Sequence, residues 1–198
     1  PISLYQRLAN VGRDMSDCGD RSSVEHVSRQ GLLNEKLLAV HGNYLDDNDI
    51  RLLAESGASV AHCPRSHDYF GHVPFRFEEL RAAGVNVCLG TDSLATVEEV
   101  DVELDMFAEM RMFRGKYPDV SPETITSMAT VNGAKALGWT KEVGEISTGS
   151  CADLLAFQYS GSADSVYDGV IEHRGPVAVM VDGQWEIHPT SLADHHGA

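Results

Sequence analysis

The stretch from residue 37 to residue 67, LLAVHGNYLDDNDIRLLAESGASVAHCPRSH, carries the pattern that decides the fold. A short apolar run, LLAVH, is followed by DDNDIRLLAESG, whose apolar residues fall at helical spacing. Asp46 or Asp47 can cap this helix at its start, and Gly57 can end it. A second apolar run, ASVAH, follows at once. The stretch therefore predicts a strand, a helix and a second strand.

The same unit recurs further along the chain. The segment PFRFEELRAAG (74–84) predicts a helix, VNVCLG (85–90) a third strand, and VEEVDVELDMFAEMRMF (97–113) a longer helix. The strands are continuous apolar runs, as expected when both faces of a sheet are covered. Three successive strand–helix units predict a parallel sheet with right-handed crossovers, which is an α/β fold.

The predicted elements change towards the C-terminus, from strand–helix units to a helix followed by short strands. SPETITSMATVNGAKALG (121–138) predicts a helix, with Ser121 as its N-cap and Pro122 at its first position. ADLLAF (152–157) and PVAVMVDGQWEI (176–187) predict short strands, the latter folded into a hairpin at Asp182-Gly183. We expect an α/β unit over residues 1–145 and a small β unit with a tail over residues 146–198.

Composition excludes several classes of function. The 198 residues carry a formal net charge of -15, which disfavours binding to nucleic-acid phosphates. The chain has no run approaching the ~20 apolar residues of a membrane span. Its four cysteines lie far apart and form no C-x-x-C pair, which favours a reduced, cytoplasmic protein.

Each of the three predicted parallel strands ends near a polar residue: His41, His62 or Asp92. Ligands of parallel α/β proteins bind at the carboxyl ends of the strands, so we expect these residues to share one rim. Histidine and aspartate together suit a hydrolytic metal site, because the carboxylate holds a cation and an imidazole can bind the metal or orient water. Taken singly, each has a structural explanation: a satisfied histidine, or a helix cap at Asp92.

The residues around His62 need separate consideration. The segment RSHDYFGHVPF (65–75) is predicted to form a loop above the rim. Its histidines, His67 and His72, are weak candidates singly but could line a substrate pocket. Cys63 directly follows His62, and adjacent residues of a strand point to opposite faces, so a nucleophilic Cys–His pair is not expected there.

The same segments resemble the amidohydrolase superfamily, in the branch of cytosine, guanine and adenosine-type deaminases and triazine chlorohydrolases. The resemblance is carried by the stretch quoted first, by LRAAGVNVCLGTDS and by ATVNGAKALGWTKEVGEISTGSCADLLAF, and it covers about residues 30–185. It implies a (β/α)8 TIM-like barrel with a small β-sandwich. This chain would supply the C-terminal part: strands six to eight, the closing helices and strands of the sandwich.

The resemblance also implies roles for single residues. Asp92 matches the strand-eight aspartate, a metal ligand that also moves the proton of the attacking water. His41 matches the strand-six histidine that hydrogen-bonds this water. The HCPRS segment matches the strand-seven segment beside the substrate, so the candidates for substrate binding are His62, Arg65, Ser66 and His67. The implied metal is zinc or iron, and the implied reaction removes an amino group, less often a halide, from a purine, pyrimidine or related ring.

Part of the family pattern is missing. The His-x-His pair of strand one and the His-x-x-Glu of strand five occur nowhere in this sequence. Asp92 and His41 cannot close a zinc site by themselves, and a complete barrel takes about 250 residues. We therefore expect this chain to be the C-terminal half of such an enzyme. It should self-associate or pair with a complementing N-terminal half across its open strand edges.

Two hypotheses remain open from the sequence. One is a metal-dependent aminohydrolase acting on a small heterocyclic amine, with this chain supplying part of the active site. The alternative is a non-catalytic, metal-free remnant or association module of the same ancestry.

Overall fold

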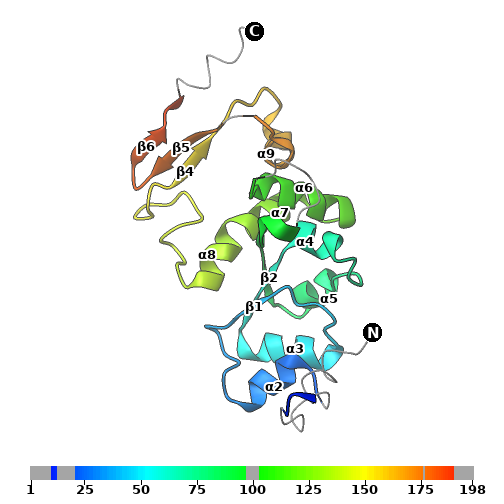
Figure 1. Cartoon of the computed structure of the whole chain (residues 1–198). Helices are drawn as coiled ribbons and strands as arrows, with labels where there is room; N and C mark the ends of the chain where they lie inside the picture. The colour runs from blue at the N-terminus through cyan, green and yellow to red at the C-terminus, as the bar shows by residue number, and fades with distance from the viewer. Residues whose placement is uncertain (1–9, 13–20, 97–102, 176, 190–198) are drawn as a thin grey trace.

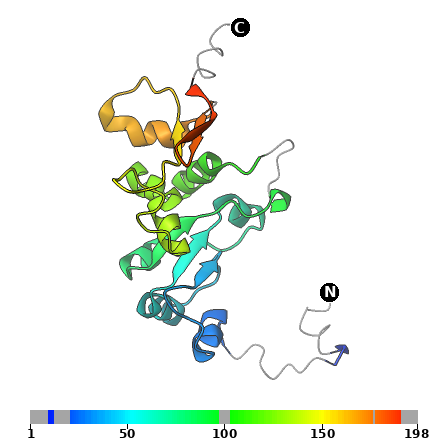
Figure 2. The same ribbon diagram turned by 90° about the vertical axis from the view of Figure 1, so that its left-hand side faces the viewer.

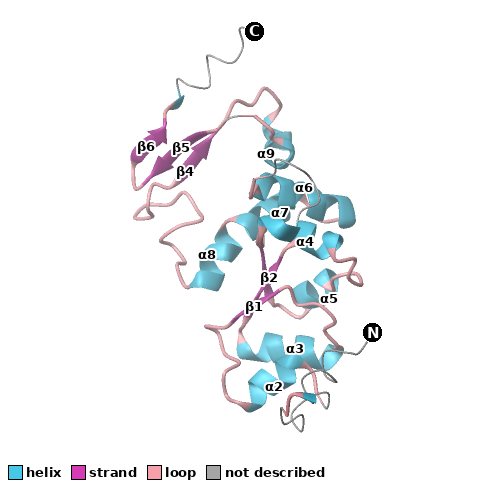
Figure 3. Cartoon of the chain, viewed as in Figure 1, coloured by secondary structure: helices cyan, strands magenta, loops and turns pink. Residues whose placement is uncertain are grey.

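Among the residues that the structure describes, the strands form two separate three-stranded sheets (Figures 1 and 3). The computed structural model describes residues 10–12, 21–96, 103–175 and 177–189. The first sheet is parallel, in the order β1-β2-β3, with strands Leu38–Val40, Ser59–His62 and Asn86–Leu89. The second is antiparallel, in the order β4-β5-β6, with strands Leu154–Ala156, Ala178–Val181 and Gln184–Ile187. The predicted α/β fold with a parallel sheet is confirmed.

Helix α3, Asp47–Ser56, connects β1 to β2 and is closed at both ends as the sequence predicts. Of the two possible caps, Asp46 is the one used: its side chain accepts a hydrogen bond from the Asp49 N–H at 2.8 Å. The Asp49 carboxylate accepts one in return from the Asp46 N–H at 3.2 Å, which completes a capping box. Gly57 ends the helix with φ 73°, a left-handed conformation that glycine adopts without strain.

Two helices, rather than one, lie between β2 and β3. Helix α5, Phe77–Ala82, was predicted, and Gly84 follows its end with φ 79°. Helix α4, Pro64–Tyr69, occupies the segment predicted as a loop. Pro64 stands at its first position, where a missing N–H costs nothing and a fixed φ favours the helix. This proline is the start signal that the loop prediction overlooked.

Helix α6, Met106–Lys116, is shorter than predicted. Of the expected span, residues 97–102 lie outside the described residues, and residues 103–105 are not helical. The helix begins after Asp105, whose side chain accepts a hydrogen bond from the Phe107 N–H at 2.8 Å. A short 3-10 turn, η1, spans Leu94–Thr96.

The helix predicted over residues 121–138 is two helices, α7 (Pro122–Ala129) and α8 (Val131–Leu137). Ser121 caps α7 as predicted, accepting a hydrogen bond from the Thr124 N–H. The break falls at Thr130, which has φ -128° and ψ -95°. Near the N-terminus lies α2, Ser23–Arg29, packed against α3.

The hydrophobic core lies between the parallel sheet and its helices. Register places Val60 and Val87 side by side on one face of the sheet, and both are buried. The helices add the fully buried side chains Leu53, Leu80, Phe113 and Ile125. The opposite face carries small or polar residues: Ser59, Ala61, Asn86 and Cys88.

The second sheet lies at the end of the molecule away from α2 and α3 (Figures 1 and 2). Its β5–β6 hairpin turns at Asp182 (φ 47°) and Gly183 (φ 77°), as predicted. Between β4 and β5 lie η2, Ala163–Ser165, and an unpredicted helix, α9, Val166–Glu172. Helix α9 packs on α6 and α7 and adds Ile171 to the core. No described helix is long and apolar enough to cross a membrane.

Candidate active site

The chain leaves β1 and β3 through turns that hold two of the predicted residues in unusual conformations. His41 has φ 70° and Asp92 has φ 54°. The left-handed region costs a residue with a side chain roughly 1–2 kcal/mol, and such residues concentrate at functional sites. The His41 N–H still donates to the Ala61 carbonyl at 2.7 Å, so sheet pairing continues into the first of these turns.

Asp92 lies at the centre of a small polar cluster. Its Oδ2 accepts a hydrogen bond from Ser66 Oγ at 2.6 Å and lies 4.0 Å from His41 Nε2. The serine bond has the length of a charge-assisted hydrogen bond. The histidine distance is too long for a direct bond but can be bridged by a shared water or substrate atom. Ser66 is buried, whereas the Asp92 and His41 side chains are 27% and 41% exposed and accessible to a ligand.

Cys63 lies near the same cluster but does not have the properties of a nucleophile. The thiol is buried, and burial raises its pKa to about 12. The carboxylates of Asp92 and Glu109 act in the same direction. A thiol with so high a pKa supplies almost no thiolate near neutral pH, so the expectation of no catalytic Cys–His pair agrees with the structure.

His62 lies in a different environment from the one expected. It pairs in register with Leu89, on the face of the sheet that packs against the helices. Its ring stacks on Phe75, with 4.0 Å between ring centroids, and the residue is 3% exposed. Burial, together with the nearby His67 and His41, lowers the pKa of His62 to about 3. His62 is therefore a neutral core residue rather than a member of the Asp92 cluster.

The three histidines of this region line one pocket of about 260 Å³: His62, His67 and His72. Two of them are tied to the turn after β1. His67 Nδ1 lies 2.9 Å from Asn43 Oδ1, and His72 Nδ1 lies 3.0 Å from the Tyr44 hydroxyl. Burial also lowers the pKa of His67. Residues of this segment line a pocket, and His67 and His72 are held by hydrogen bonds; the role of this pocket in substrate binding stays a prediction.

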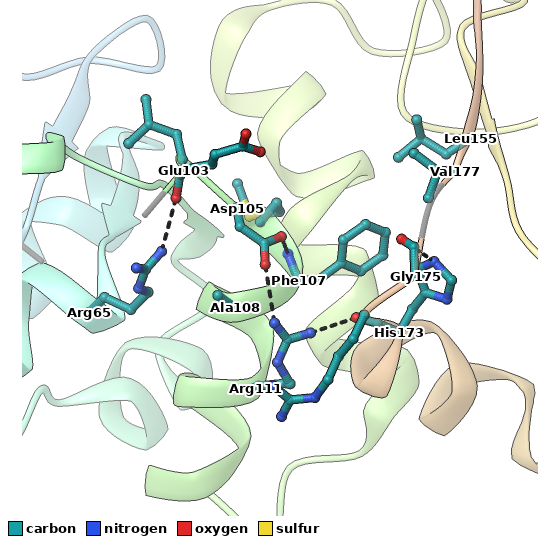
Figure 4. A pocket seen from close by; sticks show the side chains of 13 residues that line it. Arg65, Glu103, Asp105, Phe107, Ala108, Arg111, Leu155, His173, Gly175 and Val177 are labelled. Carbon is teal, nitrogen blue, oxygen red and sulfur yellow. Dashed lines mark hydrogen bonds and ion pairs between the residues drawn. The ribbon is translucent and has the colours of Figure 1, made fainter. Parts of the chain in front are cut away.

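Arg65 lines a second pocket, of about 660 Å³, beside the start of α6 (Figure 4). Its Nη1 donates to the Glu103 carbonyl at 3.5 Å and lies 3.9 Å from Glu109 Oε1. Across the pocket, Arg111 donates to the His173 carbonyl at 2.7 Å (Figure 4). The contacts of the Arg65 side chain are thus with α6 and the residues before it.

Glu109, on α6, was not a candidate from the sequence. It is fully buried, and its Oε2 accepts a hydrogen bond from the Arg65 backbone N–H at 2.9 Å. Its Oε1 has no hydrogen-bond partner among the described residues. Burial raises the pKa of Glu109 to about 7, although Arg65 opposes this shift. The signal that could have found it is its spacing of four residues from Phe113, which puts a carboxylate on the buried face of the helix.

The fit of this cluster to a metal is partial. Asp92 and His41 offer one carboxylate and one imidazole, whereas zinc sites use four ligands. Among the described residues, no group of three or more His, Cys, Asp or Glu side chains could hold a metal ion. These residues fit one side of a zinc site and do not close it.

The chain is similar in sequence to proteins of a known family. The model of the Amidohydrolase family matches residues 12–185. A 5-methylthioadenosine/S-adenosylhomocysteine deaminase from Pyrococcus abyssi is 40% identical over 137 residues, which are 68% of this chain and 32% of that protein.

Two solved structures are also similar. A zinc-bound adenosine deaminase from Xanthomonas campestris has a TM-score of 0.79 and 30% identity, covering 96% of this chain and 44% of that one. Atrazine chlorohydrolase from Arthrobacter aurescens, complexed with zinc, has a TM-score of 0.74 over 93% of this chain and 46% of that one. Its 18% identity shows a shared fold alone. The chain spans less than half the length of each of these three relatives.

Proposed function

This chain belongs to the amidohydrolase family, and from that membership we propose that it forms part of a metal-dependent hydrolase that deaminates a purine- or pyrimidine-like ring. The observation that carries the proposal is the cluster of Asp92, Ser66 and His41, with one residue from each successive strand–helix unit. The names of the relatives support an adenosine-type substrate: two of those similar to this chain are deaminases of adenosine or its derivatives.

We assign β1, β2 and β3 to strands six, seven and eight of a (β/α)8 barrel. The parallel order β1-β2-β3 and the partial coverage of the relatives support this assignment. In the same proposal, residues 1–145 belong to the barrel, and residues 146–198 contribute to a small β-sandwich. Because α9 joins the core of the first unit, the two parts share packing across this boundary.

In the proposed reaction, one water is consumed, the ring carbon gains its oxygen, and the C–N bond breaks to release ammonia. A zinc or iron ion at this site would make the water a stronger nucleophile at neutral pH. The Ser66 hydroxyl fixes one oxygen of Asp92, which leaves the other to hold a metal or to accept a proton. His41, at 4.0 Å, can orient the water or substrate atom that lies between the two side chains.

The proposed substrate contacts differ in strength. His67 lines the 260 Å³ pocket and is held by Asn43, so it is placed to contact a ring or its substituent. Ser66 acts through Asp92. Arg65 and His62 stay predictions as substrate contacts, because the Arg65 side chain pairs with α6 and the residues before it, and the buried His62 ring stacks on Phe75. We also propose a complementing barrel half as partner and a cytoplasmic location, which the free state of Cys63, Cys88 and Cys151 supports.

The incomplete ligand set favours the alternative of a metal-free association module for this chain by itself. Ammonia release from adenosine and 5-methylthioadenosine with added zinc separates the two. It should be measured on the chain alone and on the chain assembled with the half that completes the barrel. In the assembly, Asp92→Asn should lower kcat at least about 100-fold, whereas Asp119→Asn, at an exposed position, should not. Wild-type activity in Asp92→Asn, or no ammonia from the assembled wild type, would overturn the deaminase proposal.

A further inference from the structure

Helix α4 is attached at two consecutive residues. The Arg65 backbone N–H donates to Glu109 Oε2 at 2.9 Å, and the Ser66 hydroxyl donates to Asp92 Oδ2 at 2.6 Å. Glu109 lies on α6, and Asp92 follows β3. One turn of α4 therefore connects a buried carboxyl on a neighbouring helix to the carboxylate of the candidate site.

The start of α4 has no anchor of its own. Its N-cap residue, Cys63, makes no side-chain capping bond, and the helix is only six residues long. The first amides of a helix have no partner within the helix and need one from elsewhere. Glu109 supplies that partner from α6, in the position that a capping side chain usually fills.

A buried carboxyl at position 109 lowers the stability of the fold unless it makes an interaction that an apolar side chain cannot make. The side chain is fully buried beside Met110 and Phe113, and burial without full hydrogen bonding opposes folding. Among the described residues, its one hydrogen bond comes from the Arg65 backbone N–H. An apolar side chain would pack on the same helix face but would leave the Arg65 amide unpaired.

We propose that Glu109 is a positioning residue for Asp92: it holds the first turn of α4 and thereby fixes the Ser66 hydroxyl on Asp92 Oδ2. This inference rests on the role proposed above for Asp92. Among the described residues, Glu109 makes no hydrogen bond or ion pair with Asp92. Besides the charge repulsion between the two carboxyls, its link to Asp92 runs through Arg65 and Ser66.

The charges around Glu109 come from each element packed on it. The Arg65 guanidinium of α4 lies 3.9 Å from Oε1, Asp105 precedes α6, and Asp92 and Cys63 lie at the ends of β3 and β2. Burial raises the pKa of Glu109 to about 7, Arg65 lowers it, and the two aspartates raise it. The bond from the Arg65 amide strengthens when Glu109 is ionised, so this amide reports the state of the carboxyl.

The test compares four single variants and one double variant of the full chain by NMR. Glu109→Leu removes the acceptor and Glu109→Gln keeps an oxygen in the same place. Ser66→Ala cuts the second link, and Glu123→Gln changes an exposed glutamate as the control. The readout is the side-chain carboxyl carbon resonance of Asp92. Glu109→Leu should move this resonance in the same direction as Ser66→Ala, and Glu109→Gln should restore it. The Leu–Ala double variant should add little to either single change, because both act on one linkage.

A resonance of Asp92 that stays in place in Glu109→Leu, while the Arg65 amide moves, would overturn the inference and leave Glu109 a purely structural residue. If Glu109→Leu fails to fold, Glu109→Met, which keeps the length of the side chain without its acceptor, takes its place in the same comparison. An Asp92 resonance that stays in place in Glu109→Met would again overturn the inference. These readouts need no enzymatic activity, so their failure is distinct from failure of the proposed function.

Discussion

His62 is held as a neutral imidazole between Phe75 and the helices, and this should make the protein sensitive to acid. Its pKa falls from 6.5 to about 3 on folding. The unfolded chain therefore takes up a proton below pH 6.5 while the folded chain does not. The stability that this group supports is complete above pH 6.5 and is lost as the pH falls towards 3. The whole effect amounts to about 4–5 kcal/mol as an upper bound.

His62→Phe keeps an aromatic ring on Phe75 and removes the titrating group. We expect its free energy of unfolding to fall much less than that of the wild type between pH 6.5 and pH 4, with the two proteins compared at pH 8 as the reference. Urea unfolding at a series of pH values measures this. Parallel pH curves for the two proteins would show that His62 is not the neutral buried group described above.

Glu109 should act in the opposite sense. Its pKa rises from 4.5 to about 7 on folding, so the folded protein keeps a proton that the unfolded chain has lost. The contribution of Glu109 to the free energy of unfolding is complete below pH 4.5. It decreases by about 3 kcal/mol at most as the pH rises through 7. Glu109→Gln, which cannot ionise, should therefore gain about 2–3 kcal/mol relative to the wild type between pH 5 and pH 8. Urea unfolding at the same series of pH values measures the free energy of unfolding of both proteins. If the variant and the wild type differed by the same amount at pH 5 and at pH 8, the prediction would be contradicted.

Single residues differ in how far sequence could place them. His41 and Asp92 follow apolar runs, and the carboxyl ends of parallel strands lie on one rim, so their common side of the sheet could be predicted, although their distance of 4.0 Å could not. His62 could not, because the face it occupies depends on strand register and on Phe75, a contact distant along the chain. Glu109 was missed because its one hydrogen bond comes from a backbone amide 44 residues away.

At the scale of elements, the capping box of α3 gives a clear test. Asp46→Ala removes the acceptor for the Asp49 N–H and should cost about 1 kcal/mol of stability. Asp47→Ala is the matched control: its side chain is exposed and pairs with Arg76 on the surface, an interaction worth less than about 1 kcal/mol. Thermal unfolding of the two variants measures the difference. A larger loss in Asp47→Ala would mean that Asp47, not Asp46, closes this helix.

Elements with strong end signals were predictable, and those that depend on packing were not. Helix α3 has its capping aspartate and its closing glycine in the sequence. Helix α9 contains Gly169 and β-branched residues, which are weak helix formers, and it is stabilised by Ile171 packing on α6 and α7. The sequence does not indicate the break at Thr130 either, because the pattern of α7 and α8 predicts one continuous helix.

At the scale of the whole molecule, the parallel sheet leaves one side of β1 and one side of β3 without a neighbouring strand among the described residues. Open edges invite pairing with other strands. We expect the chain to self-associate, or to form a one-to-one complex when mixed with the half that completes the barrel. Light scattering over a range of concentrations checks this. A monomer that does not change with concentration, and that ignores the complementing half, would contradict the half-barrel proposal.

The global arrangement was predictable only in part. The repeated strand–helix unit predicts the parallel sheet, because each crossover helix brings the chain back to the end of the sheet at which the previous strand began. The packing of α9 against α6 and α7 was not foreseen, since it brings a segment beyond residue 145 onto the core of the first unit.

The central claim is that Asp92 belongs to a metal site used for hydrolytic deamination. The most direct measurement is the anomalous scattering of zinc in crystals of the assembled protein, with an Asp92→Ala crystal grown under the same conditions. We predict a zinc ion about 2.0–2.2 Å from a carboxylate oxygen of Asp92, and its loss in the variant. Zinc bound elsewhere, or no zinc beside Asp92 at saturating metal, would contradict the claim.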